Sequence, residues 1–411
     1  MKGLLRVLLG SVVLGGAAGT GSADELSSLK AEIESLHSRV SQLEAQQQSS
    51  VPAGYSLLSI RDGQAYFGDL RPEKRDDVIP EGSGITLSVL PAADVAPAAE
   101  VAISAELRTA LLYTDFEKGD NADIYTRARV VVRGKADTAV GEVGGYFRIK
   151  TQGGGDFSDY SQDAEMQRAF GWWKFAPDWQ LLAGQEDITA TLVTSWDWLA
   201  ATAPTRSFGP SDAYNEQMRL TYTAGAWSFA LAAEDPDYDT GDHPSNDVPS
   251  VQGYALYSTE DFTGQVVGLW QSDDHGSDDW AIGGGVALGL AKGFQLFGSA
   301  VVGQGTSVYA NNLAPIDPDE DFWAGSAGIL ADLTEETRIE LGIGYEDYQE
   351  AGEALGIGGG IYWTPAAMVT LGAGATYVDF TDAIFSEGEE PTDDNSLQVF
   401  VGVWLRGLRY E

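Results

Sequence analysis

The sequence predicts an all-β transmembrane barrel of about sixteen antiparallel strands, preceded by a short α-helical coiled coil. Three observations support this fold class. Strand-like stretches of roughly ten residues, the length of a tilted spanning strand, recur from about residue 101 onward. Short turns and long polar loops alternate between these stretches, and aromatic residues gather beside the short turns. Barrels that cross a membrane combine these features because their turns and loops lie on opposite sides.

Residues 1–23 have the organisation of a secretory signal peptide. Lys2 and Arg6 precede an apolar run, and small residues up to Ala23 indicate cleavage before Asp24. The apolar run is shorter than the roughly 20 residues that a spanning helix needs. We therefore predict export through this segment rather than anchoring by it.

Residues 24–48 predict a coiled-coil trimerisation segment. Its apolar residues are spaced alternately by three and four, as in a heptad repeat: Leu26, Leu29, Ile33, Leu36, Val40 and Leu43. Arg39 and Glu44 complete a pattern that resembles the R-h-x-x-h-E signature of short trimeric coiled coils, at positions that pair between chains. Three heptads are marginal alone, which implies partner chains. The alternative is an amphipathic helix lying on its own barrel, but the apolar stripe is narrow for that.

Residues 49–100 are expected to connect the coiled coil to the barrel on the periplasmic side. Residues 56–67 predict a hairpin with Asp62 and Gly63 at its turn. The alternative, in which this connector folds into the barrel as a plug, stays open at this point.

Residues 101–411 contain the predicted barrel. Its strands are expected near 101–114, 124–136, 139–151, 164–176, 179–189, 214–224, 226–234, 250–259, 262–272, 279–291, 294–304, 320–332, 337–347, 355–363, 368–379 and 395–406. Short turns are expected at Asp137-Thr138, Pro177-Asp178, Gly225, Lys292-Gly293 and Pro365-Ala366. Long loops are expected at 115–123, 152–163, 190–213, 235–249, 305–319 and 380–394. Trp173, Trp179, Trp227 and Trp363 lie beside short turns, where an aromatic girdle at the membrane surface is expected.

Basic residues fall on one face of several predicted strands. In residues 124–136 the bases alternate with apolar residues, so they must face the lumen, since an arginine in lipid costs roughly 2 to 4 kcal/mol. Twelve of the 16 bases after residue 100 lie between Arg108 and Arg219, whereas four bases and 32 acids follow Arg219. The predicted pore-lining and selectivity residues are Arg108, Arg127, Arg129, Arg133, Lys135, Arg148, Lys150, Arg168, Lys174, Glu186, Asp187, Asp197 and Arg219. The alternative is that these bases only neutralise lumen acids and hold loops.

The loop at 190–213 is the longest and follows the fifth predicted strand. Trp196 and Trp198 indicate packing against a surface. The position of the loop resembles that of the loop that folds into the barrel and narrows it in trimeric general porins, and this resemblance implies the same here. Acids at its root and on it, Glu186, Asp187 and Asp197, would then face the bases and set a transverse field across the constriction. The alternative is an extracellular cap that never enters the lumen.

Composition excludes several classes of function. A net charge of −38 excludes nucleic acid as a partner, since phosphate binding needs clustered positive charge. His37, His243 and His275 have no nucleophile beside them, so we predict no enzymatic activity and no cofactor. Residues 235–246 begin like a calcium loop, but Asn246 replaces the final Glu of an EF-hand, so we predict no specific metal site.

Four short motifs together resemble the DcaP-like porins: Leu181–Gln185, Phe208-Gly209-Pro210, Gln217-Met218-Arg219 and Glu234-Asp235-Pro236. The resemblance implies a periplasmic coiled coil that holds a trimer, and sixteen-stranded barrels whose basic constrictions favour anionic solutes such as dicarboxylates. The chain is also similar to alphaproteobacterial general porins. Its end departs from the usual terminal Phe of outer-membrane barrels, because it closes Leu408-Arg409-Tyr410-Glu411.

The expected function is diffusion of small hydrophilic solutes, with a preference for anions, through the bacterial outer membrane. The expected partners are membrane lipid and lipopolysaccharide, further copies of the chain in a homotrimer, and the solutes themselves. The alternative is a structural tether or adhesin whose barrel is only an anchor. In that case we expect a closed barrel without conductance.

Overall fold

The computed structural model describes Leu36 and residues 57–62, 85–90, 99–116, 119–154, 164–196, 205, 207–210, 213–235, 248–272, 278–306, 308–309, 312–313, 320–366, 368–384 and 392–406. Within these residues, no helix combines the length and the apolarity that a membrane crossing needs. The coiled-coil residues lie outside the described part of the chain, except for the exposed Leu36. The trimerisation segment therefore stays a prediction.

The regular structure of the described residues consists of β-strands. Their bounds are β1 Leu57–Asp62, β2 Ile85–Leu90, β3 Ala99–Phe116, β4 Gly119–Thr138, β5 Gly141–Gly153, β6 Glu165–Ala176, β7 Trp179–Asp187, β8 Tyr214–Ala224, β9 Trp227–Glu234, β10 Ser250–Ser258, β11 Phe262–Ser272, β12 Asp278–Ala291, β13 Phe294–Gln304, β14 Asp321–Asp332, β15 Thr337–Tyr348, β16 Gly352–Ala366, β17 Val369–Ala383 and β18 Thr392–Arg406. Each of the sixteen strands predicted after residue 100 corresponds to one of β3 to β18.

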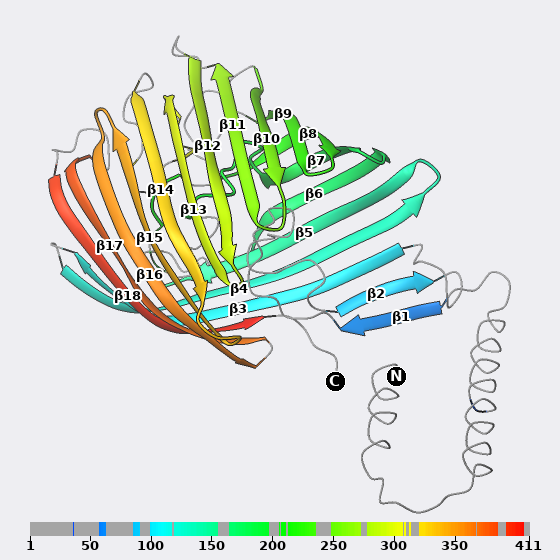
Figure 1. Cartoon of the computed structure of the whole chain (residues 1–411), viewed down its shortest axis with the longest axis horizontal. Coiled ribbons are helices and arrows are strands. Elements are labelled where there is room, and N and C mark those ends of the chain that lie inside the picture. The colour runs from blue at the N-terminus through cyan, green and yellow to red at the C-terminus, as the bar shows by residue number, and fades with distance from the viewer. Residues whose placement is uncertain are drawn as a thin grey trace, which may run out of the picture. The chain divides into compact units, whose positions relative to one another are not determined.

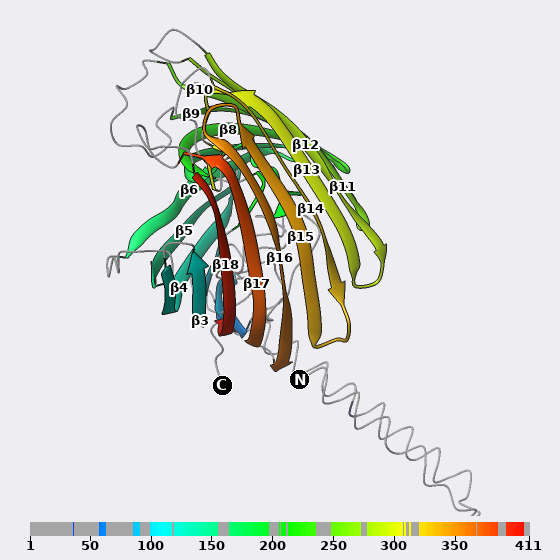
Figure 2. The same cartoon turned by 90° about the vertical axis from the view of Figure 1, so that its left-hand side faces the viewer.

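Strands β3 to β18 form a closed antiparallel ring. Each strand pairs with the next, and β18 pairs with β3 from Ser396↔Phe116 to Arg406↔Glu106. Figures 1 and 2 show this closure, with β18 in red beside β3 in cyan. A closed ring leaves no unpaired edge, which a sheet in lipid requires because no water is present to satisfy its backbone. The predicted sixteen-stranded barrel is confirmed.

The first two strands extend the sheet at one end of β3. β2 pairs with β3 from Ile85↔Ile103 to Val89↔Ala99, on the side of β3 that pairs with β18 further along. β1 pairs with β2. This pairing occupies one edge of β1, so the predicted hairpin of residues 56–67 stays a prediction. Residues 63–67 lie outside the described residues.

The alternation of short and long connections is less strict than predicted. The predicted loop 115–123 is wrong: β3 and β4 continue to Phe116 and from Gly119, and Asp115 pairs with Asp120. Polar composition here reflects exposure to water, which does not prevent strand pairing. The turn predicted at 137–138 lies at 139–140 instead, and residues 365–366 belong to β16, since the flanking strands run further than expected.

The outward face is an apolar band between two aromatic belts. The predicted belt beside the short turns is present, with Trp173, Trp227 and Trp363 each about two-fifths exposed. A second belt, which was not predicted, contains Trp270, Trp280, Trp323, Tyr345 and Tyr377. Eight residues separate Phe262 from Trp270 along β11, or roughly 20 Å across the membrane for a tilted strand.

The polar edges of these rings have partners on the water side of each belt. Trp363 Nε1 donates to Glu336 at 3.1 Å, and Trp323 Nε1 donates to Asp347 at 2.9 Å. Rings that are buried on one side and hydrogen-bonded at the polar edge are typical of a membrane–water interface. The outward face is therefore that of a membrane-spanning barrel.

Candidate functional site: the barrel interior

Side chains alternate strictly between the two faces of the wall. In β4, Tyr125, Arg129 and Val131 are buried inside the barrel, whereas Ile124 and Val130 are exposed on the outside. By this alternation the bases of β4 face the lumen. The same pattern turns Arg108 of β3 and Arg148 of β5 inward, and both are buried.

Nine predicted selectivity residues gather on the inner wall of β3 to β6. They are Arg108, Arg127, Arg129, Arg133, Lys135, Arg148, Lys150, Arg168 and Lys174. We call this surface the basic wall. Neighbouring strands place these bases side by side, for example Arg108 opposite Arg127 and Arg129 opposite Lys150.

Many of the bases are paired with acids of the same wall. Glu106 lies between Arg108 and Arg127, with contacts of 2.9 and 3.2 Å. Three further ion pairs are Lys150–Glu165 at 2.6 Å, Lys174–Glu142 at 3.1 Å and Lys135–Glu100 at 3.7 Å. Pairing of this kind restricts the side chains of the bases to one orientation, so their positive charges have fixed positions on the wall.

Aromatic rings also face the lumen along the basic wall. Arg133 lies over the ring of Trp172 at 4.9 Å, and Trp172 Nε1 donates to Glu142 at 3.1 Å. Tyr146 stacks on Phe170 with centroids 5.1 Å apart. Rings that pack against guanidinium groups hold them by cation–π attraction without removing their charge.

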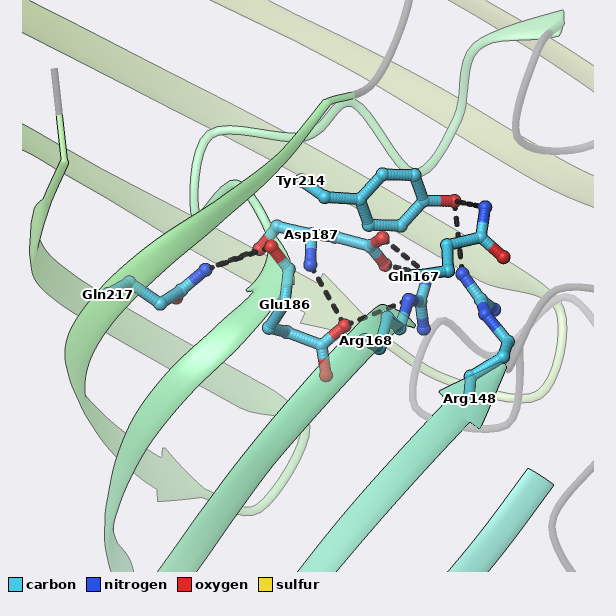
Figure 3. Close-up of polar contacts among 7 residues, drawn as sticks. All are labelled: Arg148, Gln167, Arg168, Glu186, Asp187, Tyr214 and Gln217. Atoms are coloured by element: carbon cyan, nitrogen blue, oxygen red, sulfur yellow. Dashed lines mark hydrogen bonds and ion pairs between the residues drawn. The ribbon is translucent and has the colours of Figure 1, made fainter. Parts of the chain in front are cut away.

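The end of β7 is the root of the long loop, and Arg168 binds both acids there (Figure 3). Its guanidinium contacts both carboxylate oxygens of Asp187, and Nε lies 3.2 Å from Glu186 Oε1. The backbone N–H of Asp187 donates to the same Glu186 oxygen at 2.9 Å. Glu186 and Asp187 therefore pair directly with a base, whereas the prediction placed them across the lumen from the bases. Asp197 lies outside the described residues.

Tyr214 and Gln217 of β8 complete this network. The Tyr214 hydroxyl accepts hydrogen bonds from Arg148 at 3.0 Å and from Gln167 at 3.1 Å. Gln217 Nε2 donates to the backbone carbonyl oxygens of Glu186 and Asp187 at 3.3 and 2.8 Å. Strands β5, β6 and β8 thus jointly fix the point where the chain leaves the wall.

The described residues of the long loop, 188–196, 205, 207–210 and 213, are here called the inner loop, and they lie inside the barrel as predicted. Inward side chains of successive strands accept hydrogen bonds from the loop backbone: Thr189 to Glu234 at 2.8 Å, Ala190 to Gln252 at 3.0 Å, Val193 to Gln265 at 2.9 Å and Trp196 to Ser326 at 2.8 Å. These acceptors lie on β9, β10, β11 and β14. The described part of the loop therefore follows the wall opposite the basic wall, and it is not an extracellular cap.

Two aromatic side chains seat the inner loop on glycines. Trp196 is 2 % exposed and lies over Gly342, where a Cβ atom would overlap its indole ring. Phe208 is 1 % exposed and covers Gly356, where a Cβ atom would lie 2.5 Å from its ring. The two rings stack with centroids 4.8 Å apart. Only residues without a side chain leave room for rings this close to a sheet.

Glu346 joins the inner loop to a second loop. This carboxylate is fully buried and accepts from the backbone of Gly209 at 3.1 Å and of Asn312 at 2.9 Å. Asn312 Nδ2 donates to Glu346 at 2.9 Å and to the Ser207 carbonyl oxygen at 3.0 Å. A buried carboxylate with several charge-assisted hydrogen bonds is a strong anchor.

Charge is distributed unequally between the two sides of the barrel. Among the described residues after Arg219, the bases are Lys292, Arg338 and Arg406, and the first two lie at short turns. Buried acids on this side are held by neutral donors, as Glu340 is by the Tyr362 hydroxyl at 2.5 Å. The positive charge of the interior is therefore concentrated on the basic wall, facing the inner loop.

Arg219 of β8 is separate from the basic wall. It faces inward and lines a cavity beneath the root of the inner loop. The possible calcium loop falls largely in 236–247, outside the described residues, and no cluster of metal-ligating side chains occurs in the part of the chain that is described.

A closed sixteen-stranded ring with a loop folded inside it is the architecture of an outer-membrane porin, and this chain has that fold. It is similar to the outer membrane channel DcaP of Acinetobacter baumannii, with a TM-score of 0.58 and 16 % identity over 74 % of this chain and 97 % of that one. It is equally similar to an anion-selective porin from Comamonas acidovorans, with a TM-score of 0.58 and 16 % identity over 75 % and 99 %. A loop-deletion mutant of OmpT, an outer membrane protein of Vibrio cholerae, gives a TM-score of 0.52 at 15 % identity over 75 % and 99 %. No protein-family model and no curated protein sequence matches the chain.

Proposed function

We propose that this protein is a diffusion channel of the bacterial outer membrane that favours small anionic solutes. The observation that supports this most is the inner loop, which lies along one side of the lumen and leaves the basic wall as the opposite side. A solute that passes the loop must pass between it and the fixed guanidinium groups of the basic wall.

The net charge of the chain is −38 and would by itself attract cations. Charges in water-exposed loops are screened beyond about 8 Å at physiological ionic strength. A unit charge about 6 Å from a passing ion contributes about 0.7 kcal/mol in water, or roughly a threefold change in local ion concentration. Selectivity is decided where the passage is narrowest, so the basic wall outweighs the distant acids.

The similar structures support the same reading. One is described as an outer membrane channel and the other as an anion-selective porin. At this identity the likeness extends to the fold, so the anion preference depends on the arrangement of bases in this chain.

The test is the reversal potential of single channels in a salt gradient. The double substitution Arg129→Gln and Arg133→Gln should move the reversal potential toward cation selectivity, because it removes two positive charges from the basic wall. The matched control is Lys292→Gln with Arg338→Gln, which removes two positive charges at the short turns and should leave it nearly unchanged. A wild-type channel that is strongly cation-selective, or a double variant with wild-type selectivity, would contradict the proposal. Absence of conductance in the intact protein would favour the anchor function instead.

We also propose that the protein is a homotrimer, held by the predicted coil of residues 24–48 and by the apolar outer walls of the barrels. Deleting residues 24–50 should weaken heat-resistant trimers on gels while the barrels still fold. A native mass of the intact protein that corresponds only to a monomer would show that the coil has another role.

A further inference from the structure

A cavity of about 470 Å³ lies inside the barrel, next to the root of the inner loop. Ile188 and Val193 of the loop border it on one side, and the inward faces of β8, β9 and β10 border it on the others. The turn between β8 and β9 borders its far end. Its volume is within the range of about 300 to 1,000 Å³ that is usual for small-molecule sites.

Arg219 supplies the positive charge of this cavity. It makes no ion pair or hydrogen bond with the residues that the structure describes, and its side chain is partly exposed to the cavity. The lysines of the basic wall differ, since Lys150 and Lys174 have ion pairs at 2.6 and 3.1 Å. Asp187 also borders the cavity, but Arg168 already binds its carboxylate. The buried carboxylate of Glu234 interacts electrostatically with Arg219 without a direct ion pair, so the guanidinium keeps its hydrogen-bond donors for an anion.

Hydroxyl groups line the same cavity as Arg219. Ser228 Oγ and the Tyr254 hydroxyl lie 3.3 Å apart, and Ser258 Oγ lies 3.1 Å from Thr263 Oγ1. Each hydroxyl has one donor and two acceptor positions, so these pairs keep capacity for further hydrogen bonds. Leu256 and Val193 add an apolar surface that suits the C–H face of a sugar ring.

We propose that this cavity is a binding subsite for small hydroxylated carboxylates, that is, sugar acids and hydroxy acids. Arg219 binds the carboxylate as a planar donor pair, and Tyr254 and Ser228 bind the hydroxyl groups. A neutral sugar would not use the charge of Arg219, and an apolar carboxylate would not use the hydroxyls. This inference rests on the proposed channel function, which it refines by naming a class of solute.

The experiment measures current block of the reconstituted full-length protein by glucuronate, cyclohexanecarboxylate and glucose. These probes have similar size but differ in charge and hydroxyl groups. Glucuronate is expected to block at the lowest concentration. Arg219→Gln should raise its half-blocking concentration about tenfold or more, which is the loss of one charge-assisted hydrogen-bond pair. Arg219→Lys should recover part of the effect. Tyr254→Phe with Ser228→Ala should weaken block by glucuronate but not by cyclohexanecarboxylate.

The matched control is Arg338→Gln, which removes an arginine outside the cavity and should leave block unchanged. Equal block by glucuronate and cyclohexanecarboxylate, or wild-type block in Arg219→Gln, overturns the subsite while the channel itself still conducts. If the intact protein does not conduct, the proposed function fails, and calorimetric titration of glucuronate in detergent micelles then decides the subsite separately. Heat-modifiable migration of each variant on gels establishes that its barrel has folded.

Discussion

Truncating Phe208 tests whether the contacts of its ring with the barrel wall hold the inner loop in place. Phe208 is 1 % exposed, lies against Gly356 and stacks on Trp196. Phe208→Ala removes a ring that is fully buried against a rigid sheet, where the glycines cannot move inward to fill the space. Such truncations cost about 3 to 5 kcal/mol.

This energy acts on the seating of the loop, because the barrel ring is closed by strands that do not include Phe208. At 1.4 kcal/mol per factor of ten, the ratio of unseated to seated loop rises roughly a hundredfold to several thousandfold. The remaining hydrogen bonds, from Trp196 to Ser326 and from Gly209 to Glu346, keep the seated state populated. We therefore expect frequent brief current steps rather than a permanently altered channel.

Single-channel recording measures this directly as the frequency of current steps. The matched control is Phe229→Ala, the same truncation on the outer face of β9, where Phe229 is 42 % exposed. Both variants should form heat-modifiable barrels. Equal step frequencies in Phe208→Ala and Phe229→Ala would refute the reasoning that this seat holds the loop.

Three further substitutions probe the same assembly. Gly342→Leu places a side chain where the Trp196 indole lies, so it should also unseat the loop, and unchanged current noise would argue against the glycine seat. Arg168→Gln leaves the carboxylates of Glu186 and Asp187 buried together without their base. This should lower the free energy of unfolding of the barrel by about 3 to 5 kcal/mol, measured by denaturant titration. Lys292→Gln is the control and should have no effect. Glu346→Gln keeps the shape of the side chain but weakens its charge-assisted hydrogen bonds to Gly209 and Asn312 by about 1 kcal/mol each. This variant should raise the frequency of current steps less than Phe208→Ala does. A larger effect would show that the carboxylate contributes more than the ring to holding the loop.

Local pattern was sufficient for the strands and their faces. In β4 the alternation of Arg127, Arg129 and Arg133 with apolar residues determines which face meets lipid, because a charged side chain there has only one tolerable direction. The aromatic belt at the short turns was predictable because Trp173 and Trp227 adjoin turn residues. The opposite belt was missed, since Trp270 and Trp323 lie within strands, and only the register of their neighbours brings them to one level.

Partners across the lumen could not be predicted in the same way. Glu186 and Asp187 were expected to face the bases at a distance, yet Arg168 binds both, because pairing of β6 with β7 brings the two strand ends together. The contact between the Trp196 ring and Gly342 likewise joins residues that are far apart in the sequence.

The sequence by itself determined a membrane barrel, its number of strands, the inward direction of the bases and their concentration before Arg219. These features depend on each residue and its near neighbours, through the two-residue period of a strand and the cost of charge in lipid. Tertiary structure alone decided which acids neutralise which bases, where the inner loop lies and that Arg219 borders a cavity. Those outcomes depend on ring closure and strand register, which bring together residues more than a hundred positions apart, such as the Trp196 backbone N–H and the Ser326 hydroxyl.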